Sequence, residues 1–394
     1  MTRAVFNKIR REELVRLTQK LVRIPSVNPP GNEIAVAEAL AQEMRSYGFA
    51  SKLAEVSPKR TNAIATYSGK KKGRVILLNG HMDVVPVGNI DAWKCDPFSA
   101  TLSKGRIYGR GSVDMKGGLA AVAIACKAFV EEHGDNFEGS IILTGVVDEE
   151  SAGLGTKHLV ENGIKAHMAV IAEPSDGTIY RAHKGVLWFK VGTKGHSIHS
   201  SRVTSKGTEN AIYKMSKVVS ALQNYLLILE KRKNALVGNP TISVGVIEGG
   251  TKANVVPDTC MITVDRRLLP NESPKKALGE IQKILSELSQ KDRTLKMEVE
   301  VILEREGAIV GSNENIVKIT KEAVKEVVGK SPKVTGCIAT TDMAFLVNQG
   351  KIPTVVYGPG SLQQAHVVDE YIEVDELVKA SKVYASILER VLCR

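Results

Sequence analysis

Histidine and carboxylate side chains recur in this sequence directly after segments that are predicted to be β-strands. In an open α/β sheet the carboxyl ends of the strands meet at one edge, where ligands bind. Imidazole and carboxylate are zinc ligands, and a carboxylate can bridge two ions. Two histidines and three carboxylates suit two zinc ions, with a bridging hydroxide as the nucleophile of a hydrolase. The candidates are His81, Asp83, Asp114, Asp148-Glu149-Glu150, Glu173 and His366.

Each of these features has an ordinary structural explanation when it is taken alone. His81-Met82-Asp83 is typical of a helix cap or loop, and Asp148-Glu149-Glu150 is typical of solvated surface charge. A residue such as His366 is often a hydrogen-bonded core histidine. Their common position at strand ends on one predicted edge is what favours a metal site.

The elements that would position these residues alternate in the first third of the chain. The continuous apolar run at Val75–Leu78 is typical of a strand buried on both faces, and Ile141–Val147 and Met168–Ala172 are also predicted to be buried strands. Helical spacing occurs from Glu33 to Tyr47 and again after Lys116. This alternation predicts a mainly parallel sheet with helices on both faces.

The middle of the chain has a different order of elements. Between residues 185 and 303 the patterns follow one another as β-α-β-β-α-β, the ferredoxin-like arrangement. The α/β pattern then returns with a helix over Asn315–Val328, a strand over Ile352–Tyr357 and a helix over Asp375–Val391. The sequence therefore predicts one discontinuous domain, residues 1–184 and 304–394, interrupted by a second domain over residues 185–303.

Composition narrows the class of protein. The 394 residues carry a formal net charge of +11, which favours anionic partners in general. The longest basic runs contain only three residues and no interleaved aromatic residue, so nucleic-acid binding is not expected. The five cysteines include no Cys-x-x-Cys pair, which favours a reducing cytoplasm over a disulfide framework. We find no signal-peptide core and no apolar stretch of membrane-spanning length, so no membrane association is expected.

Seven short motifs follow one another along nearly the whole chain: HMDVVP, GRGSVDMKGG, DEESAGLGT, AEPSD, GHSIHSS, GGTKANVVPD and GPGSLQQAHVVDEY. In this order they resemble the dinuclear-zinc amidohydrolases and peptidases. That family includes acetylornithine deacetylase, succinyl-diaminopimelate desuccinylase, aminoacylases and carboxypeptidases. The resemblance implies a hydrolase of linear amide bonds with two zinc ions per subunit, for which cobalt or manganese can substitute.

The resemblance also implies a ligand set. His81 and Glu173 would bind one zinc ion, and Glu150 and His366 would bind the other. Asp114 would bridge the two ions.

Other residues around the ligands would act through them. A non-proline cis peptide would join Asp114 to Met115, and Asp83 would accept the second ring N–H of His81. Within Asp148-Glu149-Glu150 the family pattern makes Glu149 the general base, which takes a proton from the attacking water and passes it to the leaving amine. Asp148 is then left with a structural role.

The ferredoxin-like insert resembles the family's lid and dimerisation domain, so a homodimer is expected. His199 matches the position that stabilises the tetrahedral oxyanion from the partner subunit, although His196 lies close by in the same motif. Asn254 and Arg267 would bind the substrate carboxylate, and Arg266 is the neighbour that could be confused with Arg267. Thr340-Thr341-Asp342 resembles a substrate-side turn but fits a helix N-cap equally well.

These features predict metal-dependent hydrolysis of an N-acyl amino acid, with water activated between two zinc ions, in cytoplasmic amino-acid biosynthesis. The run from Arg181 to Gly185 contains His183 and Lys184 in place of paired arginines, which favours N-acetyl substrates such as N-acetylornithine over N-succinyl-diaminopimelate. Lys184 could still serve a succinyl group as a point charge. The alternatives are a dipeptidase or carboxypeptidase, a succinyl-diaminopimelate desuccinylase, or a metal-free binding or regulatory protein.

Overall fold

The structure is a computed structural model that describes residues 2–204 and 207–393. The chain divides into two compact units. The first unit comprises Met1–Arg181, Val310–Thr335 and Thr341–Arg394, and the second comprises Ala182–Ile309 and Gly336–Thr340. The sequence pattern does not indicate that Gly336–Thr340 returns to the second unit. The lid and dimerisation roles of that unit stay predictions.

The first unit is built on a sheet whose centre is parallel. Strands β6, β3, β7 and β15 lie side by side in that order and run in one direction. The antiparallel hairpin of β1 and β2 extends the sheet beyond β6. The bounds are β1 (Ala50–Ser57), β2 (Arg60–Ser68), β3 (Lys71–His81), β6 (Glu138–Val146), β7 (Met168–Ile171) and β15 (Thr354–Val356).

The sheet continues beyond β15 with antiparallel strands. The chain passes into the second unit within β8 (Ile179–His183), against which β13 (Ala308–Ile309) and β14 (Val334–Cys337) pair. A separate small sheet contains β16 (Tyr371–Glu373), β5 (Arg106–Tyr108) and β4 (Thr101–Ser103). The pairing of β16 with β5 brings the segment after His366 beside the loop that carries Asp114.

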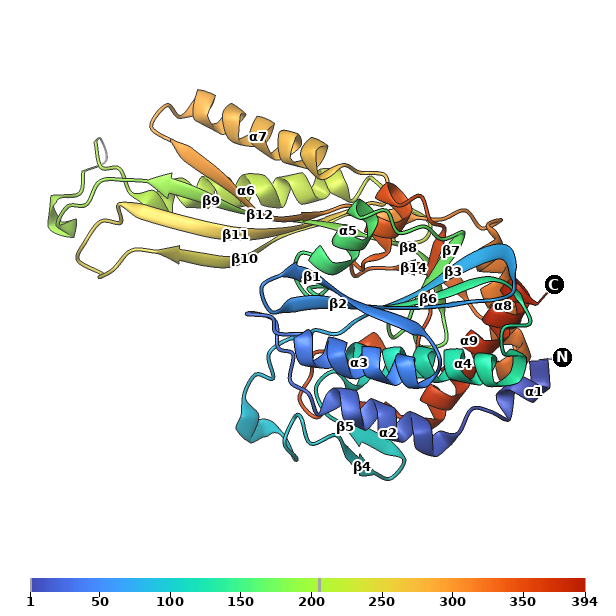
Figure 1. Ribbon diagram of the computed structural model, residues 1–394. Helices are drawn as coiled ribbons and strands as arrows, with labels where there is room; N and C mark the ends of the chain where they lie inside the picture. The colour runs from blue at the N-terminus through green and yellow to red at the C-terminus, as the bar shows by residue number, and fades with distance from the viewer. Residues whose placement is uncertain (1, 205–206, 394) are drawn as a thin grey trace. The chain divides into compact units, whose positions relative to one another are not determined.

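Helices cover both faces of the central sheet. Figure 1 shows α3, α4 and α9 on one face and α5 on the other. The helix α4 is apolar around most of its circumference because it is buried between the sheet, α2 and α9. The bounds are α1 (Thr2–Phe6), α2 (Arg11–Val22), α3 (Ile34–Ser46), α4 (Gly117–His133), α5 (Leu154–Glu161), α8 (Asn315–Val328) and α9 (Val374–Leu392).

The start of α4 lies unusually close to the end of β7. A Cβ atom on Gly118 would lie 2.2 Å from the main-chain oxygen of Ala172, so only glycine allows this approach. The close packing brings the loop before α4, which contains Asp114, next to Glu173. Thus a residue without a side chain helps to set the spacing of two candidate ligands.

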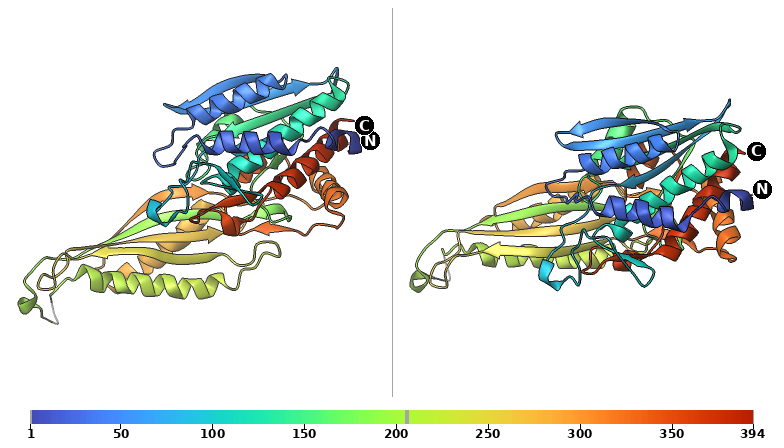
Figure 2. Two further views of the ribbon diagram at one scale, coloured as in Figure 1. Left: turned by 90° about the horizontal axis from the view of Figure 1, so that it is seen from below. Right: turned by 60° about the horizontal axis from the view of Figure 1, so that its bottom comes forward.

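The second unit contains the predicted β-α-β-β-α-β order. Its elements are β9 (Gly185–Lys194), α6 (Ala211–Leu229), β10 (Thr241–Gly249), β11 (Thr259–Leu268), α7 (Pro274–Lys291) and β12 (Met297–Arg305). The antiparallel sheet has the order β10-β11-β9-β12, as the ferredoxin-like arrangement requires. The helices α6 and α7 bury apolar side chains such as Leu222 and Ile281 against this sheet, which contributes Phe189 of β9 to the same core. Figure 2 shows the long strands of this unit from two further directions.

The fold class predicted from the sequence is confirmed. One feature was missed, because the sequence-based assignment contained no strand between Tyr47 and Val75, where β1 and β2 form their hairpin. The burial of β1 does not alternate regularly, so its sequence shows no clear period of two. Among the described residues, we find no helix that is both long and apolar enough to span a bilayer.

Candidate metal centre

The candidate ligands converge at the carboxyl ends of the parallel strands in the first unit. His81 is the last residue of β3, Glu149 and Glu150 follow β6, and Glu173 follows β7. Because these strands are parallel neighbours, their carboxyl ends meet at the same edge of the sheet. The loop before α4 supplies Asp114.

Asp114 lies between two groups of potential ligands. Its Oδ1 atom is 3.0 Å from Nε2 of His81, and its Oδ2 atom is 3.3 Å from Nε2 of His366. His81 is in turn 3.4 Å from Oε1 of Glu173, and His366 is 3.0 Å from Oε1 of Glu150. The two carboxylate oxygens of Asp114 therefore face different histidines, each paired with its own glutamate.

Glu149 also lies close to this cluster. Ligand atoms of His81, Glu149 and Glu173 all lie within 4.8 Å of one another, as do those of His81, Asp114 and Glu150. The geometry thus permits Glu149 to be a ligand as well as a base. The structure thus brings together the side chains of six of the eight candidates: His81, Asp114, Glu149, Glu150, Glu173 and His366.

The electrostatics of the cluster indicate a shortage of positive charge. Burial and the negative charge of Asp114 raise the pKa of Glu150 to about 7 and raise the pKa of Glu173 well above its usual range. Hydrogen bonds to Asp114 and Glu150 raise the pKa of His366 to about 10. Burial opposes the charged form of His81, but Glu173 and Asp114 outweigh it and raise the pKa of His81 well above its usual range.

Without cations, the cluster therefore retains protons to balance its carboxylates. Burial alone would raise the pKa of Asp114, yet hydrogen bonds from His366 and His81 lower that pKa below its usual range. Oxygen and imidazole donors with surplus negative charge are the chemistry that divalent transition-metal ions require. The residues present fit such ions.

Asp83 contacts the cluster differently from the prediction. The ring Nδ1 of His81 is 2.9 Å from the main-chain oxygen of Asp83, whereas the carboxylate Oδ1 of Asp83 lies 3.6 Å away. The carboxylate instead accepts the main-chain N–H groups of Glu149 and Glu150, each at 3.1 Å. Asp83 therefore fixes the orientation of the His81 imidazole. It also fixes the backbone of Asp148-Glu149-Glu150, which we call the acidic turn.

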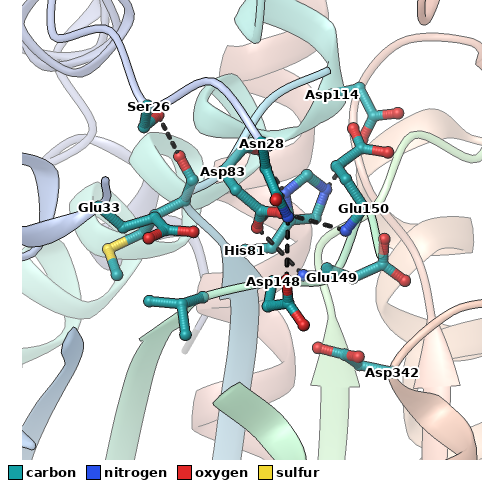
Figure 3. A network of polar contacts seen from close by, with 12 residues as sticks. Ser26, Asn28, Glu33, His81, Asp83, Asp114, Asp148, Glu149, Glu150 and Asp342 are labelled. Carbon is teal, nitrogen blue, oxygen red and sulfur yellow. Dashed lines mark hydrogen bonds and ion pairs between the residues drawn. The ribbon is translucent and has the colours of Figure 1, made fainter. Parts of the chain in front are cut away.

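Asp148 belongs to a buried polar network that the sequence analysis missed. Figure 3 shows Asn28 between the carboxylates of Asp83 and Asp148. Its Nδ2 group donates to Oδ2 of Asp83 at 2.8 Å and to Oδ1 of Asp148 at 3.0 Å. Arg60 donates to Asp148 at 2.6 Å and also pairs with Glu33. Single polar residues far apart in the sequence provide no pattern from which such a network can be predicted.

The loop of Asp114 is held by a buried ion pair. Glu370 accepts the main-chain N–H groups of Val113 at 2.9 Å and Asp114 at 3.2 Å, and it pairs with Arg110 at 2.6 Å. The peptide between Asp114 and Met115 is cis, as predicted. Glu370 was not singled out, although it lies in the motif of His366.

The second unit carries the remaining candidates at two separate ends. His199 is exposed, and its neighbour Ser200 donates its main-chain N–H to the main-chain oxygen of Asn254 at 3.0 Å. These residues lie beyond the end of β9 at which Lys194 pairs with Thr259. Arg267 lies near the other end of β11, roughly 26 Å along the strand at about 3.3 Å per residue. Therefore Asn254 and Arg267 of one chain lie too far apart to contact one small carboxylate together, and their role in binding the substrate stays a prediction.

The neighbouring candidates have structural contacts. Arg266 is fully buried and pairs with Glu272, whereas Arg267 is partly exposed and donates to Asp265 at 2.9 Å. In Thr340-Thr341-Asp342, the hydroxyl of Thr341 accepts the main-chain N–H of Met343 at 3.3 Å, as a helix N-cap does. The roles of this segment as a helix N-cap and as a substrate-side turn both stay predictions.

Residues 77–390 match peptidase family M20/M25/M40. The chain belongs to this family. It is 31% identical to an N-formyl-4-amino-5-aminomethyl-2-methylpyrimidine deformylase of Halalkalibacterium halodurans, over 94% of this chain and 92% of the relative. It is 27% identical to a probable succinyl-diaminopimelate desuccinylase of Staphylococcus aureus, over 95% of this chain and 96% of the relative.

The fold agrees with this membership. A solved M20 family metallo-carboxypeptidase of Sulfolobus solfataricus superimposes with a TM-score of 0.82 at 23% identity, covering 96% of this chain and 98% of that one. The resemblance to the amidohydrolase and peptidase family is thereby confirmed. The protein is a hydrolase of a family whose members act on amide bonds, as predicted.

The ion pair of Glu370 and Arg110 generates a stability prediction. Glu370→Gln should lower the free energy of unfolding by about 3–5 kcal/mol, because it leaves a guanidinium buried without a counter-charge. Glu373→Gln is the matched control, since Glu373 pairs with Arg106 at the surface, where solvent screens the interaction. Urea unfolding of both metal-free variants measures the difference. Equal effects of the two substitutions would contradict the importance of the buried pair.

Proposed function

We propose that the protein is a two-metal deacylase that hydrolyses the amide bond of an N-acyl amino acid. The observation that carries this proposal is the position of Asp114, whose Oδ1 faces His81 and whose Oδ2 faces His366. A carboxylate that presents its two oxygens to two separate sets of ligands suits a pair of divalent ions. Family membership supports the amide-hydrolase chemistry.

The proposed ligands follow the two groups in the site. His81 and Glu173 would hold one ion, Glu150 and His366 the other, and Asp114 both. Zinc is the proposed metal, with cobalt or manganese as substitutes. When bound, such ions polarise the amide carbonyl and lower the pKa of water.

Glu149 is the proposed general base. Its main-chain N–H is held by Asp83, and its carboxylate lies near His81 and Glu173 without a place in either proposed ligand set. From this position a carboxylate accepts a proton from the attacking water and returns it to the leaving amine. The products are then a carboxylic acid and a free amine.

The base and ligand roles predict different losses on substitution. Glu149→Ala should lower kcat by about 10²–10⁴ and still bind two zinc ions per chain, since only proton transfer is impaired. His81→Ala and Asp114→Ala should lose both metal and activity. Metal content by plasma mass spectrometry, together with kcat on one substrate, measures both effects. Near-wild-type turnover of Glu149→Ala excludes it as the base, and loss of metal makes it a ligand.

The second unit bears on the acyl group. A succinyl substrate carries an extra carboxylate that requires its own cation. His183 is fully buried, and burial lowers its pKa to about 4, so it is uncharged at neutral pH. The ammonium group of Lys184 is largely buried and already donates to the main-chain oxygen of Asn239. Neither side chain therefore offers a readily available cation, which supports a preference for a small uncharged acyl group.

The proposed substrate ranking follows from this. N-acetylated amino acids, N-acetylornithine first, should be cleaved with at least about tenfold higher kcat/KM than N-succinyl-diaminopimelate, a difference of about 1.4 kcal/mol. A second candidate is an N-formyl aminomethylpyrimidine, which the 31% identical deformylase favours. These compounds and a set of dipeptides are assayed side by side on the zinc-loaded enzyme. A preference for the succinyl compound contradicts the ranking and makes Lys184 the next residue to replace.

A homodimer is proposed from the surface of the second unit. The strand β10 is an edge of its sheet and exposes Val246 and Ile247, while α6 exposes Tyr213 and Leu227. Exposed apolar edges of this kind are typical of surfaces that pair with another chain. Two chains would also explain why His199 and Asn254 lie far from Arg267 within one chain, because one protomer can supply the first pair and its partner the arginine.

Mixed dimers test this arrangement. If His199 acts in the partner's site, a His199→Ala protein mixed with a Glu149→Ala protein should regain activity, because one of the two sites in each hybrid is complete. His199→Ala alone should lower kcat by about 10²–10³, the usual effect of removing one oxyanion donor. The control is each variant diluted with itself. Absence of recovery despite demonstrated subunit exchange, or a monomer in gel filtration, would contradict the shared site.

A further inference from the structure

Arg60 lies between two buried carboxylates outside the proposed ligand set. Its guanidinium pairs with Glu33 through both Nε and Nη2, and its Nη1 donates to Oδ1 of Asp148 at 2.6 Å. Glu33 is fully buried, and Asp148 and Arg60 are 3% and 9% exposed. Charged groups are therefore concentrated where water has little access.

Burying charged groups of this kind costs desolvation free energy, so such a network contributes little net stability to a fold. Replacing buried ion pairs with apolar residues of similar volume is often neutral or stabilising, so their presence is weak evidence for a role in stability. Their directional hydrogen bonds can instead fix one arrangement of the chain. The question is then which segment this network holds.

The network holds the turn that begins at Asp148. This residue has a φ of +68°, which residues with side chains rarely adopt, and its Oδ2 accepts the main-chain N–H groups of Ala152 at 3.2 Å and Leu154 at 3.4 Å. The unusual backbone conformation immediately precedes Glu149 and Glu150. Loss of the Arg60 contact would remove the charged partner of the carboxylate that holds this turn.

The same network also reaches the loop of His81. Asn28 donates to Asp148 and to Asp83, and Asp83 accepts the main-chain N–H groups of Glu149 and Glu150. Figure 3 shows this continuous path from Asp148 through Asn28 to Asp83 and His81. The position of the acidic turn relative to the histidine is therefore fixed from both sides.

The segment that carries Asn28 and Glu33 packs tightly against the guanidinium. A Cβ atom on Gly31, whose φ is +82°, would lie 2.4 Å from Cζ of Arg60. Glycine therefore allows the chain to close around Arg60 at this point. The contact of Arg60 that leads to the site is its hydrogen bond to Asp148, the residue that directly precedes Glu149.

We propose that Arg60 is a positioning residue, which through Asp148 sets the geometry of the Glu149-Glu150 turn and thereby the affinity of the metal centre and the alignment of the base. This inference rests on the proposed roles of Glu149 and Glu150. It assigns a function to the SVNPPGNE segment and to Arg60 that the ligand motifs do not include.

Two substitutions of Arg60 test the proposal. Arg60→Lys keeps a cation that can reach one carboxylate but loses the planar guanidinium that pairs with both Glu33 and Asp148. Arg60→Met removes the charge. The matched controls are Arg16→Lys and Arg16→Met, because Arg16 also forks onto a buried glutamate of the first unit, Glu43, but has no path to the acidic turn. Each protein is compared for Tm, kcat, KM, zinc affinity and the visible spectrum of its cobalt form.

We expect the two Arg60 variants to differ from the two Arg16 variants in zinc affinity and kcat. Arg60→Met should lower zinc affinity and kcat by about 10–100-fold, as the loss of a partner that orients ligands does, and leave KM within about twofold. Arg60→Lys should recover part of both losses, and the cobalt spectrum should change with Arg60 alone. The Arg16 variants should lower only Tm.

Other outcomes decide against the proposal. If the Arg60 variants lower Tm but retain wild-type zinc affinity, cobalt spectrum and kcat, as the Arg16 controls do, Arg60 is merely structural. If Arg60→Met does not fold, Arg60→Lys and its control Arg16→Lys provide the comparison. Zinc affinity and the cobalt spectrum do not depend on the substrate, so a wrong substrate assignment leaves this test valid. A wild-type protein that binds no divalent ion would overturn the proposed function and this inference together.

Discussion

The burial of several carboxylates at one edge of a sheet is the constraint around which the first unit is organised. Asp114, Glu150 and Glu173 are each close to a histidine, and their mutual repulsion is balanced by protons in the absence of cations. Like charges at such distances separate unless the chain holds them in place. The surrounding contacts are therefore directed at the backbone of the ligand loops as much as at the ligands.

Three loops are held by three different devices. Glu370 accepts the backbone N–H groups of the Asp114 loop, and Asp83 accepts those of the acidic turn. The close approach of Gly118 to the end of β7 positions the third loop, which carries Glu173. Because these contacts are made to main-chain atoms, they fix where each side chain starts without using its carboxylate oxygens.

The second unit contributes chemistry of a different kind. Its residues that resemble the family's substrate contacts lie at opposite ends of one strand, with His199 and Asn254 at one end and Arg267 at the other. A rigid β-strand cannot bring its two ends to one small molecule. In the proposed homodimer, a second chain that pairs through the exposed apolar residues of β10 and α6 would bring the opposite end of this strand to the same site.

Much of this protein was determined by local sequence alone. The order of strands and helices, the ferredoxin-like insert and the gathering of His81, Glu150, Glu173 and His366 follow from hydrophobic periodicity and from the rule that parallel strands end at one edge. Asp114 instead follows β5 of the separate small sheet, so that rule does not place it. Those patterns are local, so they can be recognised in the sequence without knowledge of distant contacts. The hairpin of β1 and β2 was not predicted, because the burial pattern of β1 is irregular.

The contacts that orient the candidate ligands could not be predicted from local sequence, because they join distant segments of the folded chain. That Asp83 accepts the main-chain N–H of Glu149, that Glu370 supports Asp114, and that Arg60 reaches Asp148 depends on residues 66 to 256 positions apart. A single buried arginine or asparagine has no repeating pattern, and its partner is chosen by the packing of the whole unit. The types of side chain that perform chemistry are thus readable from the sequence, whereas the contacts that orient them arise only when distant segments are brought together by folding.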